Sequence, residues 1–234
     1  MPDSSELVSR LNGVRDRIAD AVRRSGRPPS SVRLVAVSIT FPIDAIRTAA
    51  TAGQLEFGEN KVQEGQAKIP ALGGLPLRWH LVGHLQSNKA RKAAALFDVI
   101  HSVDSADLLR TLNEGAADRR RTIDVLIQVD LAREPTKHGV PVEQVPSLIE
   151  AAGSCEAARL VGLMILPPPL GPEGTRPYFA ALRTLRDDLV RSGVPEPTLR
   201  ELSMGMSDDF ETAIEEGATM VRVGSAIFGE RDYR

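Results

Sequence analysis

Apolar positions along the chain change repeatedly between a helical spacing and the short runs that are typical of buried strands. Near the N-terminus, apolar residues recur every three or four positions: Leu7, Leu11, Val14, Ile18 and Val22. That spacing places them on one face of a helix, which we expect over about residues 4–25. Gly26 and the prolines that follow it end the pattern.

Short apolar runs then alternate with amphipathic stretches over about residues 32–230. Eight runs have the length and composition of buried strands: 32–37, 55–57, 79–82, 99–103, 122–129, 160–165, 199–202 and 220–223. The stretches between most of them predict helices, so the pattern is one of repeated βα units. Eight units predict a single α/β domain over residues 1–234, a (β/α)8 TIM-type barrel with an extra N-terminal helix.

An open doubly wound sheet is the alternative fold. It is disfavoured in its dinucleotide-binding form because no G-x-G-x-x-G motif follows the first strand. The proline-rich segment 167–177 is expected to be a surface loop within the barrel domain, since the βα pattern resumes after it. The helix that follows Leu202 is expected to start with Ser207 as its N-cap.

Composition narrows the classes of partner and compartment. The formal net charge of −2 argues against a general nucleic-acid or anionic-membrane surface. No apolar run approaches the roughly 20 residues that a membrane span requires. A single cysteine, Cys155, excludes an intrachain disulfide and fits a cytoplasmic protein. The polar, acidic N-terminus does not have the pattern of a secretory signal.

Two polar segments follow the last two strands, where this fold often binds phosphate. The first is Ser203-Met204-Gly205-Met206-Ser207 and the second is Gly224-Ser225. Free backbone N–H groups and serine hydroxyls favour an anion at such loops. In the alternative interpretation, Ser207 is only a helix cap and the glycines only allow turns. Spacing along the chain does not decide between these two interpretations.

Arg222 and the histidines are the other candidates for chemistry. Arg222 lies inside the last strand, and alternation places it on the opposite face from Val221 and Val223. It is expected either to contact a ligand inside the barrel, or to pair with a carboxylate or face outward. The histidines show no metal-ligand spacing, so no metal site is expected; they are His80, His84, His101 and His138.

Several long motifs, in the right order, resemble one family, the pyridoxal 5'-phosphate (PLP) homeostasis proteins, often called the YggS or PROSC family. They extend over nearly the whole chain: LVAVSITFP (34–42), FGENKVQE (57–64), WHLVGHLQSNKAR (79–91), HSVDS (101–105), KHG (137–139), VGLM (161–164), LSMGMSDDFETAI (202–214) and VRVGSAIFGER (221–231). The resemblance implies a barrel similar to the N-terminal domain of alanine racemase, without that enzyme's second domain.

The resemblance also implies a cofactor and its site. It places PLP at the carboxyl ends of the strands, with its phosphate near the two polar loops and its pyridine nitrogen facing the arginine of the last strand. The implied cofactor-binding positions in this sequence are Asn60, Ser203, Gly205, Met206, Ser207, Arg222, Gly224 and Ser225. No catalytic residue is implied. Proteins of this family are thought to carry, buffer or deliver PLP, with PLP-dependent apoenzymes as recipients. The resemblance suggests a monomer or a weak dimer.

One position departs from the family motif. The motif reads VSKT, and its lysine forms the Schiff base with PLP, whereas this chain has Ile39 there. Isoleucine has no amine, so we expect PLP to bind noncovalently. Among the five lysines, Lys89 and Lys137 follow strands and are the other amines to consider. The alternatives are a racemase-like PLP enzyme and a PLP-free regulatory scaffold. Whether Ile39 is natural or introduced stays open.

Overall fold

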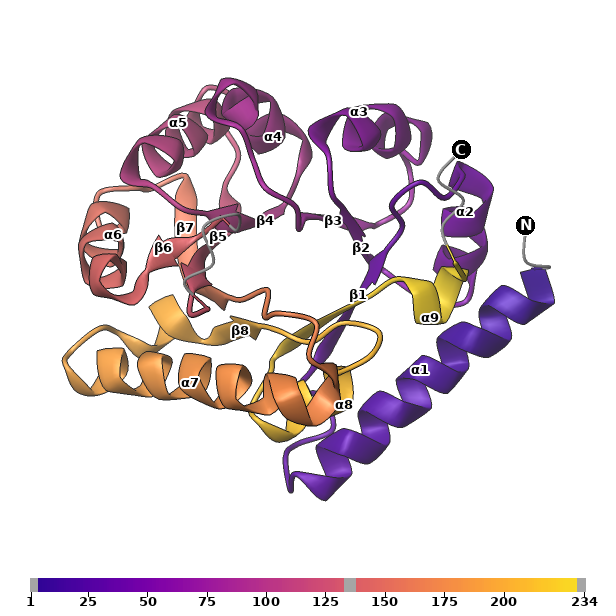
Figure 1. Cartoon of the computed structure of the whole chain (residues 1–234). Coiled ribbons are helices and arrows are strands. Elements are labelled where there is room, and N and C mark those ends of the chain that lie inside the picture. The colour runs from indigo at the N-terminus through magenta and orange to yellow at the C-terminus, as the bar shows by residue number, and fades with distance from the viewer. Residues whose placement is uncertain (1–3, 133–137, 231–234) are drawn as a thin grey trace.

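Eight parallel strands close into a barrel in the computed structural model, which describes residues 4–132 and 138–230 (Figure 1). The ring closes because β1 pairs with β9 as well as with β2, and β4 pairs with β5. The strands are β1 (Arg33–Val37), β2 (Glu56–Glu59), β3 (Arg78–Leu81), β4 (Val99–Val103), β5 (Ile123–Asp130), β7 (Ala158–Met164), β8 (Glu201–Ser203) and β9 (Met220–Val223). This topology confirms the predicted barrel and excludes the open sheet.

A short additional strand, β6 (Val140–Pro141), pairs with the end of β5. Helices surround the barrel (Figure 1): α2 (Ile43–Thr51), α3 (Val62–Ala71), α4 (Ala90–Leu96), α5 (Ala106–Ala117), α6 (Val145–Ala152), α7 (Gly171–Arg191), α8 (Phe210–Glu215) and α9 (Ser225–Phe228). Single 3-10 turns lie at Ser87–Lys89, Val142–Gln144 and Glu196–Leu199. In the described part of the chain, no helix has the length and apolar character needed to span a membrane.

The extra N-terminal helix, α1 (Ser4–Arg24), lies outside the ring, beside α2, α8 and α9 (Figure 1). Leu7, Leu11 and Val14 are buried on its inner face, as the spacing predicted. The Arg17 guanidinium donates two hydrogen bonds of 2.8 Å to the Glu211 carboxylate on α8. Hydrophobic burial therefore supplies most of the free energy that holds α1 against the barrel, because an exposed ion pair contributes only about 0–1 kcal/mol.

On several strands the apolar side chains face the surrounding helices, while polar side chains point into the barrel. Val221 and Val223 of β9 belong to the main hydrophobic core between strands and helices, whereas Arg222 points the other way, into the barrel. His80 and His101 likewise face inward and are fully buried. Barrel interiors are mostly filled by branched apolar side chains. This one contains a polar column, which indicates a role for the interior beyond packing.

Two expectations about local structure were wrong. The segment 167–177 is not a loop throughout, because α7 begins at Gly171 and includes Pro172 and Pro177. Pro172 lies in the first turn, where its missing N–H has no helical partner, whereas Pro177 lies inside the helix and leaves one helical hydrogen bond unmade. Ser207 is not the cap of α8, since Asp209 occupies that position and the Ser207 hydroxyl bonds elsewhere.

Candidate functional site

A pocket of about 600 Å³ opens at the carboxyl ends of β1, β2, β8 and β9. Its size lies within the roughly 300–1,000 Å³ that is usual for small-molecule sites. Its lining combines apolar side chains with hydroxyl, amide and charged groups. The lining residues are Val37, Ile39, Asn60, Val82, Leu166, Met206, Ser207, Asp208, Arg222, Gly224, Ser225 and Glu230.

Ile39 forms part of an apolar wall of this pocket. It packs with Val37 and Val82 in a small buried cluster that is separate from the main core. Val37 and Ile39 lie two residues apart, so they share the inward face of β1 and its extension. Thr40 follows with φ at +65°, a left-handed conformation that costs free energy in a β-branched residue. The Thr40 N–H donates to the Glu64 carboxylate at 2.9 Å, which helps to hold this turn.

Behind Ile39, on the outer face of the barrel, a buried charged cluster holds the ends of β1 and β2. The Lys68 ammonium donates to the Ser38 carbonyl at 2.7 Å and to the Glu59 carboxylate at 2.8 Å. The Ser38 hydroxyl donates to the same Glu59 oxygen at 2.7 Å. Burial raises the pKa of Glu59 to about 7, although Lys68 and Ser38 oppose that shift. These bonds hold the backbone at Ser38 and Thr40, the two neighbours of Ile39, so that the Ile39 side chain points into the pocket.

Arg222 forms the charged base of the pocket. Its guanidinium donates to the Ser203 hydroxyl at 2.5 Å and to the Ile165 carbonyl at 2.9 Å. Burial lowers the pKa of Arg222 to about 10, with partial opposition from Asp209, so the group remains protonated at neutral pH. Among the described residues, no carboxylate forms an ion pair with Arg222. Its charge therefore remains available to a ligand in the pocket.

A chain of hydrogen bonds runs from Arg222 through the barrel interior to His80 on β3. The Ser203 hydroxyl lies 2.8 Å from Nδ1 of His101, whose Nε2 lies 2.9 Å from Nδ1 of His80. Nε2 of His80 lies 3.0 Å from the Glu56 carboxylate. Because β8 and β4 are not neighbours in the ring, the bond between Ser203 and His101 must cross the interior.

The groups at the two ends of this chain determine where its protons lie. Arg222 can only donate and an ionised Glu56 can only accept. Although burial raises the pKa of Glu56, its contacts with His80, Arg33 and Arg78 hold it below the ordinary value. The carboxylate of Glu56, 3.0 Å away, favours a proton on Nε2 of neutral His80. In that arrangement His101 donates from Nε2 to His80, and Ser203 donates to Nδ1 of His101. Burial lowers the pKa of both histidines, which agrees with two neutral rings.

The two predicted anion loops contact each other directly. The Ser207 hydroxyl oxygen accepts hydrogen bonds from the backbone N–H groups of Gly224, at 3.2 Å, and Ala226, at 3.4 Å. Ser207 can still donate its own proton into the pocket. Gly205 has φ at +92°, and a Cβ there would lie 2.9 Å from Cα of Phe210. Glycine is therefore required for the loop to turn toward β9.

Most of the sequence-predicted cofactor positions come together at this pocket. Seven of them line it: Ile39, Asn60, Met206, Ser207, Arg222, Gly224 and Ser225. Two do not: Ser203 is buried behind Arg222, and Gly205 shapes the loop. Asn60 reaches the pocket because its neighbour Gly83 has no side chain, since a Cβ there would lie 2.2 Å from the Asn60 amide oxygen.

No lysine among the described residues lines the pocket. Lys89 lines a neighbouring hollow, together with His84 and Asn60. Lys137 lies outside the described residues. Lys68 comes within 2.7 Å of the Ser38 carbonyl, but on the far side of the strand from Ile39. Among the described residues, no lysine therefore supplies the pocket with the amine that Ile39 lacks.

Sequence reasoning missed the buried partners of the site. His80, His101 and Glu56 were not linked to Arg222, because the bonds between them join strands that are far apart in sequence. Lys68 was noted only as a lysine. One signal was available in the sequence: Glu64 and Lys68 are four residues apart, a spacing that favours an ion pair on one face of a helix, as α3 proves to be.

Comparison with known proteins agrees with this architecture. Residues 12–232 match the family described as alanine racemase, N-terminal domain. The structure has a TM-score of 0.71 to an alanine racemase of Clostridium difficile at 16% identity, covering 96% of this chain and 56% of that one. At that identity the likeness establishes the fold alone.

Two closer relatives carry more specific names. The pyridoxal phosphate homeostasis protein of Aquifex aeolicus is 43% identical over 225 residues, covering 96% of this chain and 98% of that protein. The structure of PipY from Synechococcus elongatus with PLP bound is 43% identical, with a TM-score of 0.80, and covers 91% of this chain and 100% of that one. This protein belongs to the pyridoxal phosphate homeostasis protein family.

Proposed function

We propose that this protein binds PLP noncovalently in the pocket at Ile39 and acts without catalysis in the homeostasis of that cofactor. The observation that carries the proposal is the composition of the pocket. An apolar wall, a buried protonated arginine and two paired hydroxyl-bearing loops surround one cavity. These groups match the three parts of PLP, namely a ring face, a ring nitrogen and a phosphate.

Each part of the pocket has a distinct task in this proposal. Val37, Ile39 and Val82 pack against the ring, and their burial excludes water from that side. Arg222 donates to the pyridine nitrogen but cannot protonate it, because a guanidinium keeps its protons at neutral pH. Ser207, with the backbone of Gly224 and Ser225, binds the phosphate. Asp208 and Glu230 are exposed at the pocket and restrict where a dianion can lie.

The bound cofactor supplies an aldehyde that reacts with amines, and this pocket offers it none. Retention then depends on the phosphate contacts, Arg222 and apolar packing. A protein that holds PLP without a covalent link is suited to releasing it. We therefore propose a cytoplasmic monomer that passes PLP to PLP-dependent apoenzymes. The same lack of an amine in the pocket disfavours a racemase-like enzyme.

The test combines a spectrum with a mass. Purified protein is titrated with PLP while the absorbance of the cofactor is followed, and the sample is then reduced with borohydride and its intact mass measured. We expect saturable binding with no added mass. Arg222→Met should weaken binding strongly, whereas Arg119→Met, a change to an exposed arginine outside the pocket, should not.

Each alternative result has a clear meaning. No saturable change in absorbance would favour a PLP-free scaffold. A mass increase after reduction would show a covalent link through another lysine, which peptide mapping would identify, with Lys89 and Lys137 examined first. Turnover of an amino acid by the PLP-loaded protein would favour the enzyme. Light scattering tests the proposed monomer separately.

A further inference from the structure

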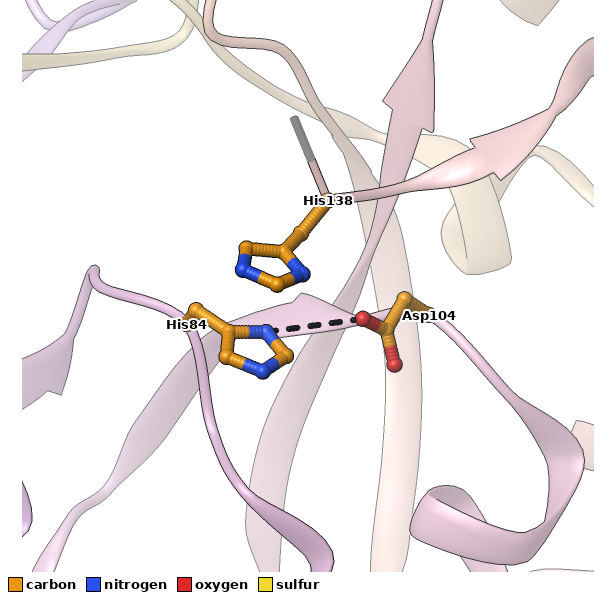
Figure 2. A group of neighbouring side chains, drawn as sticks. All are labelled: His84, Asp104 and His138. Atoms are coloured by element: carbon orange, nitrogen blue, oxygen red, sulfur yellow. Dashed lines mark ion pairs between the residues drawn. The ribbon is translucent and has the colours of Figure 1, made fainter. Parts of the chain in front are cut away.

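Three side chains with metal-binding atoms gather at the carboxyl end of the barrel, next to the pocket but not lining it. They are His84, Asp104 and His138, and their potential ligand atoms all lie within 4.8 Å of one another. Figure 2 shows the two imidazole rings one above the other, with the carboxylate beside them. The spacing of the histidines along the chain gave no sign of this cluster, because the fold assembles it.

Each member comes from a different strand end. His84 follows β3, Asp104 follows β4, and His138 lies two residues before β6, which pairs with the end of β5. The backbone of His138 is held in place, since its carbonyl accepts a hydrogen bond of 2.7 Å from the Gln128 amide on β5. The carboxyl ends of adjacent parallel strands meet at one edge, so the convergence is built into the barrel.

The potential ligand atoms of this cluster have few protein partners. Nδ1 of His84 lies 3.6 Å from the Asp104 carboxylate, which is too long for a hydrogen bond. The rings of His84 and His138 stack at 3.4 Å with an angle of 7° between them. Within residues 4–132 and 138–230, neither imidazole forms a hydrogen bond. Stacking occupies the ring faces and leaves the in-plane nitrogen lone pairs available.

We propose that His84, Asp104 and His138 form a binding site for a divalent transition-metal ion of the zinc class. Two imidazoles and one carboxylate are ligands that suit zinc, cobalt and nickel, and three protein ligands leave a fourth position for water. Metal–ligand distances of about 2.0–2.2 Å require the three atoms to move closer together. The two imidazoles must also turn so that a nitrogen of each faces the ion. Both histidine side chains are at the surface, so these movements meet little resistance.

The site adjoins the PLP pocket through Asn60, which lines both the pocket and the hollow at His84. The metal proposal nevertheless does not depend on PLP binding. The buried histidines, His80 and His101, cannot replace the ligands, since they bond to each other inside the barrel. Cys155 cannot either, because it lies in the turn between α6 and β7, at the opposite end of the strands.

The test uses Co²⁺ as a spectroscopic probe on the full chain without an affinity tag. Titration should produce visible d–d bands that saturate at one ion per chain, and Zn²⁺ should abolish them by displacement. His84→Ala, Asp104→Asn and His138→Ala should each weaken binding by more than the roughly 10–100-fold loss that follows removal of a residue hydrogen-bonded to a metal ligand. Circular dichroism shows whether each variant is folded.

Two matched variants control for other ligands. Asp107→Asn removes an exposed carboxylate on the first turn of α5, three residues beyond Asp104, and should bind Co²⁺ as the unaltered protein does. Cys155→Ser should also retain the bands. Absence of saturable bands in the unaltered protein, or equal binding by the folded His84→Gln and His138→Gln variants, would overturn the proposal.

Discussion

Ile39 determines what kind of contact the pocket makes with its ligand. Its side chain packs with Val37 and Val82, and the strained turn at Thr40 directs the chain away immediately afterwards. A longer side chain at this position would extend into the cavity, since Ile39 already lines it. The identity of residue 39 therefore decides whether the pocket binds its ligand noncovalently or forms a covalent bond with it.

Replacing Ile39 with lysine should convert one kind of pocket into the other. We expect Ile39→Lys to give a borohydride-trappable adduct at position 39 and at least about tenfold tighter PLP binding, which corresponds to about 1.4 kcal/mol. Intact mass and peptide mapping measure the adduct, and titration measures the affinity. Ile39→Met is the matched control, because it changes shape without adding an amine. Gain of neither adduct nor affinity in the lysine variant would contradict the assigned position.

Ser203 acts on the pocket only through Arg222 and His101. Ser203→Ala removes both hydrogen bonds and leaves a buried guanidinium N–H without its partner, which should cost about 1–3 kcal/mol of unfolding free energy. PLP binding should weaken because Arg222 is no longer oriented. Urea denaturation and PLP titration measure the two effects.

A second buried serine provides the control for that variant. The hydroxyl of Ser102 is fully buried and has no hydrogen-bond partner in the described structure. Ser102→Ala should therefore be neutral or stabilising. Equal effects of the two substitutions would show that the hydrogen-bond chain does not position Arg222.

At the scale of elements, α1 is the part of the fold that is added to the barrel. Leu11 is fully buried on its inner face. Leu11→Ala should lower the free energy of unfolding by about 2–5 kcal/mol, through lost burial and the cavity left behind. Ser9→Ala, on the exposed face of the same helix, should change it by less than about 0.5 kcal/mol. Equal midpoints for the two variants in urea would show that α1 is not part of the cooperative unit.

The elements were largely predictable because each follows a local pattern. All eight barrel strands and α1 lie where the apolar spacing placed them, with ends that differ by a few residues. The start of α7 was missed because Pro172 and Pro177 look like a loop signal, although the first helical turn tolerates Pro172 and the helix continues through Pro177. The Ser207 cap was wrong because a hydroxyl bonds to whichever N–H groups the fold brings near. Here these belong to β9 and α9, which local sequence does not reveal.

At the scale of the whole molecule, the buried histidines couple stability to pH. Burial lowers the pKa of His80 and His101, so both are neutral in the folded protein. The unfolded chain takes up these protons below about pH 6.5, the ordinary value for histidine. The contribution of the two neutral rings to stability is therefore fully present above that pH and is lost as the pH drops below it, by up to about 1.4 kcal/mol per pH unit for each histidine.

Urea denaturation at pH 7.5, 6.5 and 5.5 measures this dependence. Glu59, whose pKa of about 7 lies in this window, takes up a proton in the folded state and so opposes the histidine dependence. Glu56, Arg33, Arg78 and Arg222 also act on the two rings. His101→Gln should reduce the slope between pH 6.5 and 5.5, whereas His138→Gln, at the exposed cluster, should retain most of it. An unchanged slope in the folded His101→Gln variant would show that the His101 ring accepts a proton in the folded state.

The candidate site was predictable only in part, because closure of the whole barrel assembles the rest of it. Ile39, Arg222 and the two polar loops were visible because each carries a local motif. The chain from Arg222 to His80 and the cluster at His84 depend on which strand ends the closed ring brings together. Neither has a spacing of its own in the sequence.

The ring closes between its first and last strands, and Val35 of β1 pairs with Arg222 of β9. The pocket spans that junction, since Ile39 comes from one side and Arg222 and Gly224 from the other. During synthesis on the ribosome, the emerging chain can form most of its βα units but not this junction. The pocket is therefore completed only after β9 has been made and has docked against β1. A chain truncated before β9 lacks one side of the pocket. Ligand binding therefore distinguishes full-length folded molecules from incomplete ones.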